Sequence, residues 1–435
     1  FISLQPTYES IAGSEQLGPN VFWSLTAIAY LATTRNRDHL AQLLPFLDQS
    51  LAFLLTFLEE VQLPPGDRRL VLRGQPGWVD GRTRDEEAEG FLVNAPGPLW
   101  IDVLVREGFT SDSNAMYLGL LRSFADFYAH LASEHLVADA QGYAQKAAEL
   151  LRLRDGVLRA MNAVLWERDQ NDHYVTSVAP SVPAGSGEVR DFVDYDANLL
   201  AVAFGALDGD AAAAAAVLAR IDRNNVSHVR ATWCSEVPYS GDRCDCYIVG
   251  GSVCGDSVVT LARIGYADAL ARKRVGQADV VRELLLQPLQ RDLLQYVWLF
   301  ERYDAQGQQI RTPNYFEYPS LVSMLLREVV YGLTLTIDTL RVDPVRAATA
   351  GGAFGFFLGS WAVDYAQDAV FVRVQTQAGA QGAAEKLRLL VTGLLPQTSY
   401  ATASGTAVST DAQGRLEMSV TLGGLQEGIS LVRSS

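Results

Sequence analysis

The sequence predicts a large α-helical domain followed by a small C-terminal antiparallel β-sandwich, and three observations support this fold class. Apolar residues recur with helical periodicity from Val21 to Leu335. Short and long connections alternate strictly between the predicted helices. After Leu335 the pattern changes to the two-residue alternation that is typical of strands. We therefore expect a helical domain over residues 1–338 and a β domain over residues 339–435.

The composition is that of a folded, acidic chain. The 435 residues have a formal net charge of -15, and 20% of them are charged. This balance argues against a nucleic-acid partner, because binding to phosphates needs clustered lysine and arginine. The longest uncharged stretch, 347–363, is rich in glycine and shorter than the ~20 apolar residues of a membrane-spanning helix. We expect a soluble protein with no nucleic-acid and no membrane partner, and the sequence carries no signal for an oligomeric state.

The helical domain is expected to contain a series of separate helices. They are predicted over residues 20–34, 38–60, 113–135, 141–167, 195–206, 209–222, 256–266, 277–303 and 319–335. Residues 211–216 are six consecutive alanines, which have the highest helix propensity. No strand–helix–strand rhythm and no glycine-rich phosphate loop is present, so we expect no nucleotide cofactor and no other cofactor.

The connections between these helices predict where function lies. The short ones are 34–38, 136–140, 207–209 and 265–277, and the long ones are 1–19, 61–112, 168–194, 223–255 and 304–318. In an antiparallel array of helices, alternate connections emerge at the same end. One end of the domain should therefore carry all of the long connections, and long connections are commonly functional. The alternative is a set of tolerated insertions.

The C-terminal part shows strand patterns separated by turns. Alternating runs cover 369–374, 387–391 and 416–420, and a turn is expected over 411–414. These short strands predict the sandwich.

Four cysteines fall within residues 234–254. They fit two disulfides in an oxidising compartment or free thiols in the cytosol. A zinc site is less well matched, because Cys244-x-Cys246 lacks the usual paired spacing, and we expect no metal. The chain begins at Phe1 without a visible signal peptide, so a processed or missing start is expected; the localisation is open, with secretion slightly favoured over the cytoplasm.

The long connections carry acidic residues in distinct groups. In 61–112, Asp102, Glu107 and Asp112 recur every five residues around Arg106. Asp112 also stands where a helix cap is expected, which is its alternative explanation. Glu107 lies away from the helix start, where burial would raise its pKa as a proton donor needs.

Two further connections add carboxylates and aromatic residues. Glu317 precedes the last predicted helix among aromatic residues that include Tyr315, although an acidic residue at a helix start also favours the helix dipole. Asp191, Asp194 and Asp196 enter the helix at 195, after a connection that also contains Asp172 and His173, and capping accounts for only one of the three. Further candidates for contact with a ligand are Trp100, Trp233 and Glu236.

Paired carboxyl groups with aromatic surroundings are what sugar hydrolysis requires. One carboxyl donates a proton to the leaving oxygen, and in an inverting enzyme the other activates a water molecule. Further carboxylates hydrogen-bond the sugar hydroxyls. The sequence therefore predicts a carbohydrate substrate.

A ring of helical hairpins with all long connections at one end resembles the (α/α)6 barrel of the six-hairpin glycosidases. The segment Asp102–Asp112 resembles the acid-bearing loop of the α-L-rhamnosidases in that group, with Phe109 in place of a Trp and Ser111 in place of a Gly. The resemblance implies that Glu107 is the general acid and Glu317 the general base. It also implies that about three helices of the barrel either lie upstream of Phe1 or are missing from the helices predicted above.

The same resemblance implies a set of substrate-binding residues. Asp102 and Asp112 take this role by their places in the motif, and the candidates around them are Arg106, Asp194, Asp196, Trp233, Glu236, Trp100 and Tyr315. The expected activity is inverting, exo-acting hydrolysis of a terminal, α-L-rhamnoside-like sugar. Two alternatives remain open: a polysaccharide lyase or sugar epimerase on the same barrel, and a non-catalytic carbohydrate-binding protein.

Overall fold

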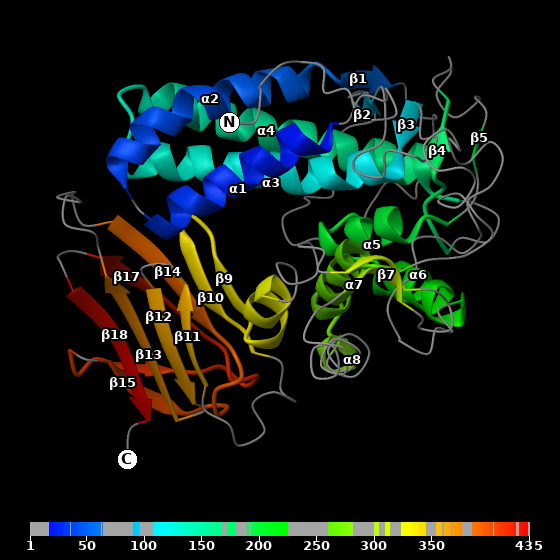
Figure 1. Cartoon of the computed structure of the whole chain (residues 1–435). Coiled ribbons are helices and arrows are strands. Elements are labelled where there is room, and N and C mark those ends of the chain that lie inside the picture. Colours follow the sequence, from blue (N-terminus) through cyan, green and yellow to red (C-terminus); the bar gives the residue numbers. More distant parts are fainter. Residues whose placement is uncertain are drawn as a thin grey trace, which may run out of the picture. The chain divides into compact units, whose positions relative to one another are not determined.

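A computed structural model of the chain describes part of the sequence (Figure 1). The described residues are 17–34, 36–61, 63, 90–95, 108–167, 172–179, 189–190, 193–224, 260–281, 300–303, 309–313, 323–344, 354–358, 361–366, 368–375, 385–402, 404–422 and 426–433. The chain divides into two compact units. Unit 1 comprises Phe1–Trp23, Ser50–Arg122 and Glu149–Leu321, and unit 2 comprises Ser24–Gln49, Ser123–Ala148 and Val322–Ser435.

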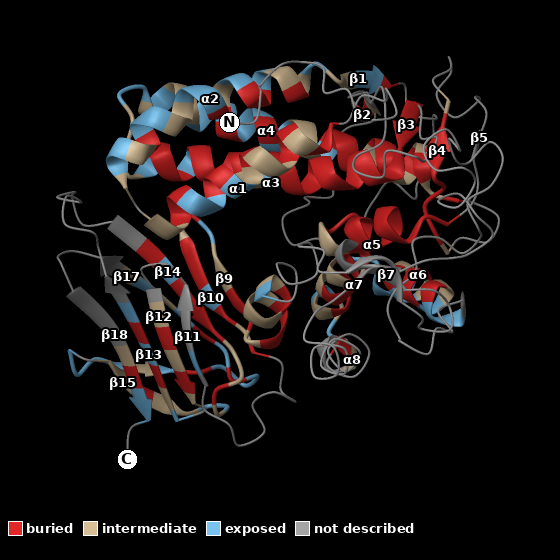
Figure 2. Cartoon of the chain, viewed as in Figure 1, coloured by how far each residue is buried: buried red, intermediate tan, exposed pale blue. Residues whose placement is uncertain are grey.

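The first six predicted helices are confirmed with changes at their ends, the largest being that the helix expected over 38–60 ends at Leu55 and residues 58–60 belong to strand β1 (Leu58–Val61). They are α1 (Gly18–Thr34), α2 (Arg37–Leu55), α3 (Ser111–Ser133), α4 (Ala140–Ala160, extended by a π-helical turn over Met161–Leu165), α5 (Tyr195–Ala203) and α6 (Ala211–Asn224). The helices alternate in burial: α3 and α5 are buried over most of their length, whereas α4 and α6 expose one side (Figure 2). The closed ring of hairpins stays a prediction.

The later helices were placed wrongly from the sequence. Helix α7 covers Ala262–Arg274 rather than 256–266, and Thr260–Leu261 before it form strand β6. The expected short connection after Gly265 is therefore helical, because Ala267, Ala269 and Ala271 pack into the core and the basic residues of the last turn favour the helix dipole.

Two more predicted helices differ from the structure at their C-terminal ends. Of the helix expected over 277–303, α8 covers Ala278–Val281, and Phe300–Tyr303 form strand β7. Of the helix expected over 319–335, the described part runs from residue 323 to Val330 and ends in a π-helical turn. Gly332 then has a φ of +66°, a conformation that favours glycine, and the chain continues as strand β9 (Leu333–Leu335).

Short strands lie within the long connections, which the sequence did not predict. In unit 1, five strands form one sheet in chain order: β1 (Leu58–Val61), β2 (Gly90–Ala95), β3 (Gly108–Thr110), β4 (Ser177–Val178) and β5 (Val189–Arg190). All of their pairings are antiparallel. Two of the long connections, 61–112 and 168–194, therefore meet in one sheet. Strands β6, β7 and β8 (Gln309–Pro313) form a further three-stranded sheet.

Unit 2 contains the two sheets of the C-terminal part. The four-stranded sheet has the order β17-β14-β10-β9, and the six-stranded sheet has the order β11-β12-β13-β18-β15-β16. Their strands are β10 (Thr339–Val342), β11 (Phe354–Leu358), β12 (Trp361–Ala366), β13 (Ala369–Gln375), β14 (Glu385–Val391), β15 (Ser399–Thr402), β16 (Ala407–Ser409), β17 (Leu416–Leu422) and β18 (Gln426–Arg433).

These two sheets share one hydrophobic cluster, to which the first contributes Leu340 and Leu389 and the second contributes Val372 and Leu431. The pairing of β10 with β14 is parallel, which departs from the expected all-antiparallel arrangement. The sandwich and the domain boundary after residue 338 stay predictions. Among the described residues, no helix has the length and hydropathy needed to cross a membrane.

Candidate functional site

Strand β3 leads directly into helix α3, and the residues at this junction are polar and buried. Asp112 is 1% exposed, and Thr110, Ser111, Ser113 and Asn114 are fully buried. Burying five consecutive polar side chains costs free energy unless they are hydrogen-bonded. Ser111, Asp112 and Asn114 make such hydrogen bonds, so the junction holds these three side chains in a defined arrangement.

Asp112 is the second residue of α3 and lies inside its first turn. Its Oδ1 accepts a hydrogen bond of 2.8 Å from the backbone N–H of Ser113. The capping explanation places an aspartate before the first turn, whereas Asp112 lies one residue past the start of the helix. The positive end of the helix dipole favours its negative charge at this position.

The residues at the start of α5 are likewise polar and buried. Asp194, Asp196 and Asn198 are fully buried. Asp194 has the extended backbone of an N-cap residue, but its side chain makes no capping hydrogen bond. Asp196 accepts a hydrogen bond of 2.8 Å at Oδ1 from the backbone N–H of Ala197. Side-chain capping by Asp194 therefore does not explain why aspartates gather here.

The five-stranded sheet connects these two helix starts within unit 1. Phe109 of β3 pairs with Val178 of β4, and Ser177 of β4 pairs with Arg190 of β5, which precedes Asp194 by four residues. Ser111 adds two hydrogen bonds across the same boundary: its N–H donates to the carbonyl of Thr176 (3.1 Å), and its hydroxyl donates to the carbonyl of Val175 (2.5 Å).

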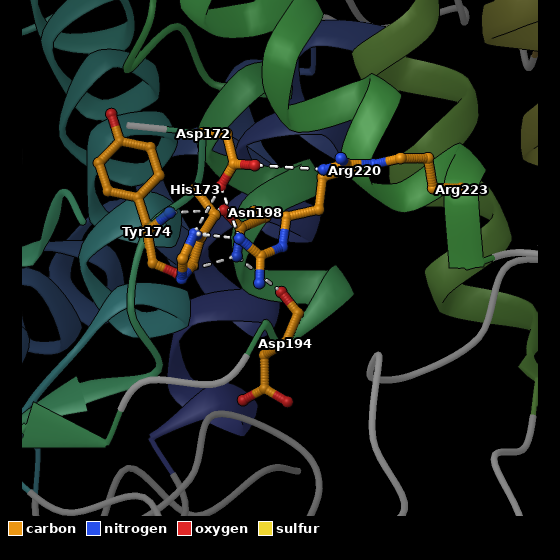
Figure 3. A network of polar contacts seen from close by, with 7 residues as sticks. All are labelled: Asp172, His173, Tyr174, Asp194, Asn198, Arg220 and Arg223. Carbon is orange, nitrogen blue, oxygen red and sulfur yellow. Dashed lines mark hydrogen bonds and ion pairs between the residues drawn. The ribbon is translucent and has the colours of Figure 1, made fainter. Parts of the chain in front are cut away.

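A network of charged groups supports the second connection (Figure 3). Arg220 of α6 donates from Nη1 to Asp172 Oδ1 at 2.6 Å, and Arg223 donates from Nη2 to Asp172 Oδ2 at 3.3 Å. His173, which is 1% exposed, lies with Nδ1 2.9 Å from Asp172 Oδ1. Figure 3 shows the carboxylate of Asp194 turned away from this network.

The network changes the acidity of its central carboxylate. Burial by itself would raise the pKa of Asp172, but the hydrogen bonds with His173 and Arg220 and the positive charge of Arg220 outweigh it. The pKa of Asp172 is therefore held below its usual value, and the group is ionised at neutral pH. An ionised carboxylate paired with two arginines is a structural support and not a proton donor.

The ring of Tyr174 anchors the segment between His173 and strand β4. It packs edge-on against Trp166 with 4.8 Å between ring centroids, and its hydroxyl donates to Asn162 Oδ1 at 2.5 Å. Burial raises the pKa of Tyr174 well above its usual value. This tyrosine is therefore a neutral core residue.

Three of the predicted site residues, Asp112, Asp194 and Asp196, lie in the described part of the chain, at the starts of two helices that follow strands of one sheet. The other predicted site residues lie outside the described residues: Trp100, Asp102, Arg106, Glu107, Trp233, Glu236, Tyr315 and Glu317. The four cysteines also lie outside them. In the described part of the chain, no group of three or more His, Cys, Asp or Glu side chains is placed to hold a metal ion.

Sequence reasoning missed Asn114 and the role of Asn198. Both are buried, and each follows an aspartate by two residues, as Asp112-Ser113-Asn114 and Asp196-Ala197-Asn198. This repeated Asp-x-Asn spacing at two helix starts was the available signal.

Comparison with known proteins gives similarity at the level of fold. No family model matches the chain, and no curated protein matches it. A solved chain titled "Sialidase" aligns over 83% of this chain and 30% of its own length, with 10% identity and a TM-score of 0.50. A GH78 family rhamnosidase of Bacillus sp. GL1 aligns over 84% and 32%, with 15% identity and a TM-score of 0.45.

A GH63 mannosylglycerate hydrolase from Thermus thermophilus aligns over 72% of this chain and 77% of its own length, with 14% identity and a TM-score of 0.40. The chain spans about a third of the length of the sialidase and rhamnosidase chains. The similarity to the chain titled "Sialidase" is a similarity of fold.

Proposed function

We propose that the chain is a glycoside hydrolase whose site is formed by its long connections, with substrate-binding carboxylates at the starts of α3 and α5. The observation that carries this proposal is the pair of buried acidic helix starts joined by β3, β4 and β5. Asp112 and Asp196 occupy equivalent second positions in α3 and α5, and buried carboxylates of this kind suit recognition of sugar hydroxyls. The similarity of fold to a chain titled "Sialidase" agrees with this proposal.

In the proposed reaction, Glu107 is the general acid and Glu317 the general base. Glu107 protonates the glycosidic oxygen as the bond from that oxygen to the anomeric carbon breaks. Glu317 removes a proton from the water molecule that attacks the opposite face of the same carbon. Water adds across the glycosidic bond, and the configuration at the anomeric carbon is inverted. Such a pair of carboxyl groups stands about 6.5–9.5 Å apart, which leaves room for the water.

The remaining candidates are proposed to bind the sugar. Carboxylates accept hydrogen bonds from hydroxyl groups, a guanidinium donates to ring and hydroxyl oxygens, and aromatic rings stack on the apolar face of a pyranose. The residues are Asp102, Arg106, Asp112, Asp194, Asp196, Trp100, Trp233, Glu236 and Tyr315. The proposed specificity is for a terminal α-L-rhamnoside-like sugar, on the strength of the Asp102–Asp112 motif.

A screen with p-nitrophenyl glycosides tests the proposal. The wild-type chain is expected to release nitrophenol from one member of a panel that begins with the α-L-rhamnoside. Proton NMR recorded within the first minutes is expected to show the anomer opposite to that of the substrate. Release of the same anomer contradicts the inverting assignment, and the absence of turnover together with saturable binding of the free sugars favours a carbohydrate-binding protein.

A further inference from the structure

Two asparagines make the same set of hydrogen bonds at the starts of two helices. At α3, Asn114 Oδ1 accepts from the backbone N–H of Val93 at 2.9 Å. Its Nδ2 donates to the carbonyl of Val93 at 3.3 Å and to the carbonyl of Thr110 at 2.8 Å. One side chain therefore joins strand β2, the residue before the helix, and the first turn of the helix.

At α5, Asn198 repeats this arrangement with Tyr174 in the place of Val93. Its Oδ1 accepts from the N–H of Tyr174 at 2.8 Å, and its Nδ2 donates to the carbonyl of Tyr174 at 3.1 Å. The same Nδ2 donates to the carbonyl of Asp194 at 3.0 Å (Figure 3). The two helix starts are thus matched bond for bond.

The match extends to the neighbouring carboxylates. Asp112 and Asp196 each stand two residues before their asparagine, and each accepts at Oδ1 from the next N–H at 2.8 Å. The backbone of the first turn therefore has the same hydrogen-bonded form at both sites, and it presents an aspartate at the same helical position.

Each asparagine ties together the two ends of a connection. Val93 lies before the segment 96–107 and Asn114 lies after it, and the pair Ala95–Gly108 of β2 and β3 brackets the same segment. Tyr174 and Asn198 enclose β4, β5 and the acidic residues of the second connection in the same way. The first enclosed segment contains Glu107, and the second contains Asp194 and Asp196.

An asparagine is the residue that these bonds require. A carboxylate offers no N–H, so an aspartate loses the bonds to the two carbonyls. Serine and threonine offer a single donor on a shorter side chain, and glutamine places its amide one carbon further away. Because both asparagines are fully buried, a lost partner is not replaced by solvent.

We infer that Asn114 and Asn198 are positioning residues. Each holds the two ends of an acid-bearing connection together and fixes the helix start on which Asp112 or Asp196 stands. Each side-chain hydrogen bond described above goes to a backbone group, so the two asparagines act through the backbone of the segments that they enclose. The catalytic consequence of this role rests on the proposed function, whereas the joining of the two ends of each connection does not.

Hydrogen–deuterium exchange with mass spectrometry tests directly whether the asparagines hold the ends of the connections together. Asn114→Ala is expected to speed exchange in residues 90–95 about tenfold and to leave residues 172–175 unchanged, and Asn198→Ala is expected to do the reverse. Asn114→Asp and Asn198→Asp keep the acceptor and the size of the side chain, and they replace the alanine variants where those fail to fold. Uniform acceleration over the whole chain, or no acceleration, overturns the inference.

Tyr117→Phe is the matched control on α3. It removes a buried hydrogen bond of 3.0 Å from the hydroxyl of Tyr117 to the carbonyl of Leu54 and touches neither connection. It is expected to lower the overall stability without accelerating exchange in residues 90–95 beyond the change in the rest of unit 1. A local acceleration in Tyr117→Phe equal to that in Asn114→Ala contradicts the assignment.

Kinetics on the aryl glycoside that the wild-type chain hydrolyses test the catalytic consequence. Asn114→Ala is expected to lower kcat about tenfold or more, because the segment that contains the acid is displaced, and to raise KM as well, because Asp112 moves with the helix start. Asn198→Ala, whose enclosed segment contains sugar-binding aspartates and no catalytic acid, is expected to raise KM with a smaller change in kcat. Tyr117→Phe is expected to change neither. Local acceleration of exchange with an unchanged kcat overturns the positioning role. A wild-type chain that hydrolyses no member of the panel overturns the proposed function. The exchange data then still decide whether the asparagines hold the ends of the connections together.

Discussion

The hydroxyl of Ser111, the first residue of α3, donates a hydrogen bond of 2.5 Å to the carbonyl of Val175. These residues belong to two connections that are separate in the sequence. The bond therefore fixes the end of the first connection to the second at the point where the acidic helix start of α3 begins. Together with the pairing of Thr110 and Ser177, it makes the two connections one structural unit.

Removal of this hydroxyl should destabilise unit 1. Ser111→Ala leaves the carbonyl of Val175 without its buried donor and should lower the free energy of unfolding by about 1–2 kcal/mol. Urea unfolding followed by circular dichroism measures the change. Ser133→Ala, at the exposed end of the same helix, should alter the free energy by less than about 0.5 kcal/mol. Equal effects of the two variants would contradict the role given to Ser111.

The buried arginine of α7 should be one of the most sensitive positions in unit 1. Arg272 Nε lies 2.7 Å from Asp268 Oδ1, and both side chains are 1% exposed. Arg272→Met leaves a buried carboxylate without this cation and should cost about 3–5 kcal/mol of unfolding free energy.

Arg274→Met is the matched control for this prediction. It removes the same charge two residues further along α7, where Arg274 and its partner Asp208 are both more than a third exposed. The expected loss is about 0–1 kcal/mol. Guanidinium unfolding curves for the two variants measure the difference, and similar midpoints would show that burial of Arg272 carries no special stability.

The pair of Asp172 with Arg220 should make stability depend on acid pH. Because the folded pKa of Asp172 is lowered, its contribution is fully present above the unfolded pKa, near 3.8, and is lost as the pH falls through the lower folded pKa. Asp172→Asn should therefore be less stable than the wild type at neutral pH, and the difference should vanish in strong acid. Thermal unfolding as a function of pH measures it, with the exposed Asp155→Asn as a control. A difference that stays constant into strong acid would refute this explanation.

Stability should also depend on alkaline pH, through Tyr365 in the C-terminal sheets. Burial, followed by the nearby Tyr400 and Asp343, raises the pKa of Tyr365 to about 12 from the usual 10.0. The stability from the un-ionised phenol is fully present below pH 10.0 and is lost as the pH rises toward about 12. The difference in tyrosinate absorbance between the wild type and Tyr365→Phe should thus have its midpoint near pH 12. A midpoint near pH 10 would contradict it.

The helices that were predictable from the sequence are those with strong local signals. The alanine run at 211–216 and the long apolar periodicity of 113–135 have the expected conformation because propensity and burial agree there. Helix α7 was misplaced because most of its buried residues are alanines and charged residues (Ala267, Asp268, Ala269, Ala271 and Arg272), which give a weak hydrophobic period, and because its basic end resembles a surface loop.

The strands of the long connections were not predictable because they are too short to show a period. Strands β4 and β5 contain two residues each, and their pairing is imposed by distant chain segments. For the same reason the asparagines were missed. Asn114 and Asn198 bind backbone groups 21 and 24 residues away, and such a contact leaves no mark on the local pattern. The aspartates were predicted because carboxylates are the groups that sugar chemistry needs, and this inference requires no knowledge of their geometry.

Hydrolysis of two glycosides by Glu107→Gln tests the proposed function most directly. An alkyl glycoside, whose leaving group is an unactivated alcohol, needs the general acid, whereas the leaving group of a dinitrophenyl glycoside departs without a proton. Glu107→Gln should lose about 100-fold or more in kcat on the alkyl glycoside and keep most of its rate on the dinitrophenyl glycoside, while Glu317→Gln should lose both. Equal losses of Glu107→Gln on the two substrates, or full activity on the alkyl glycoside, would contradict the account.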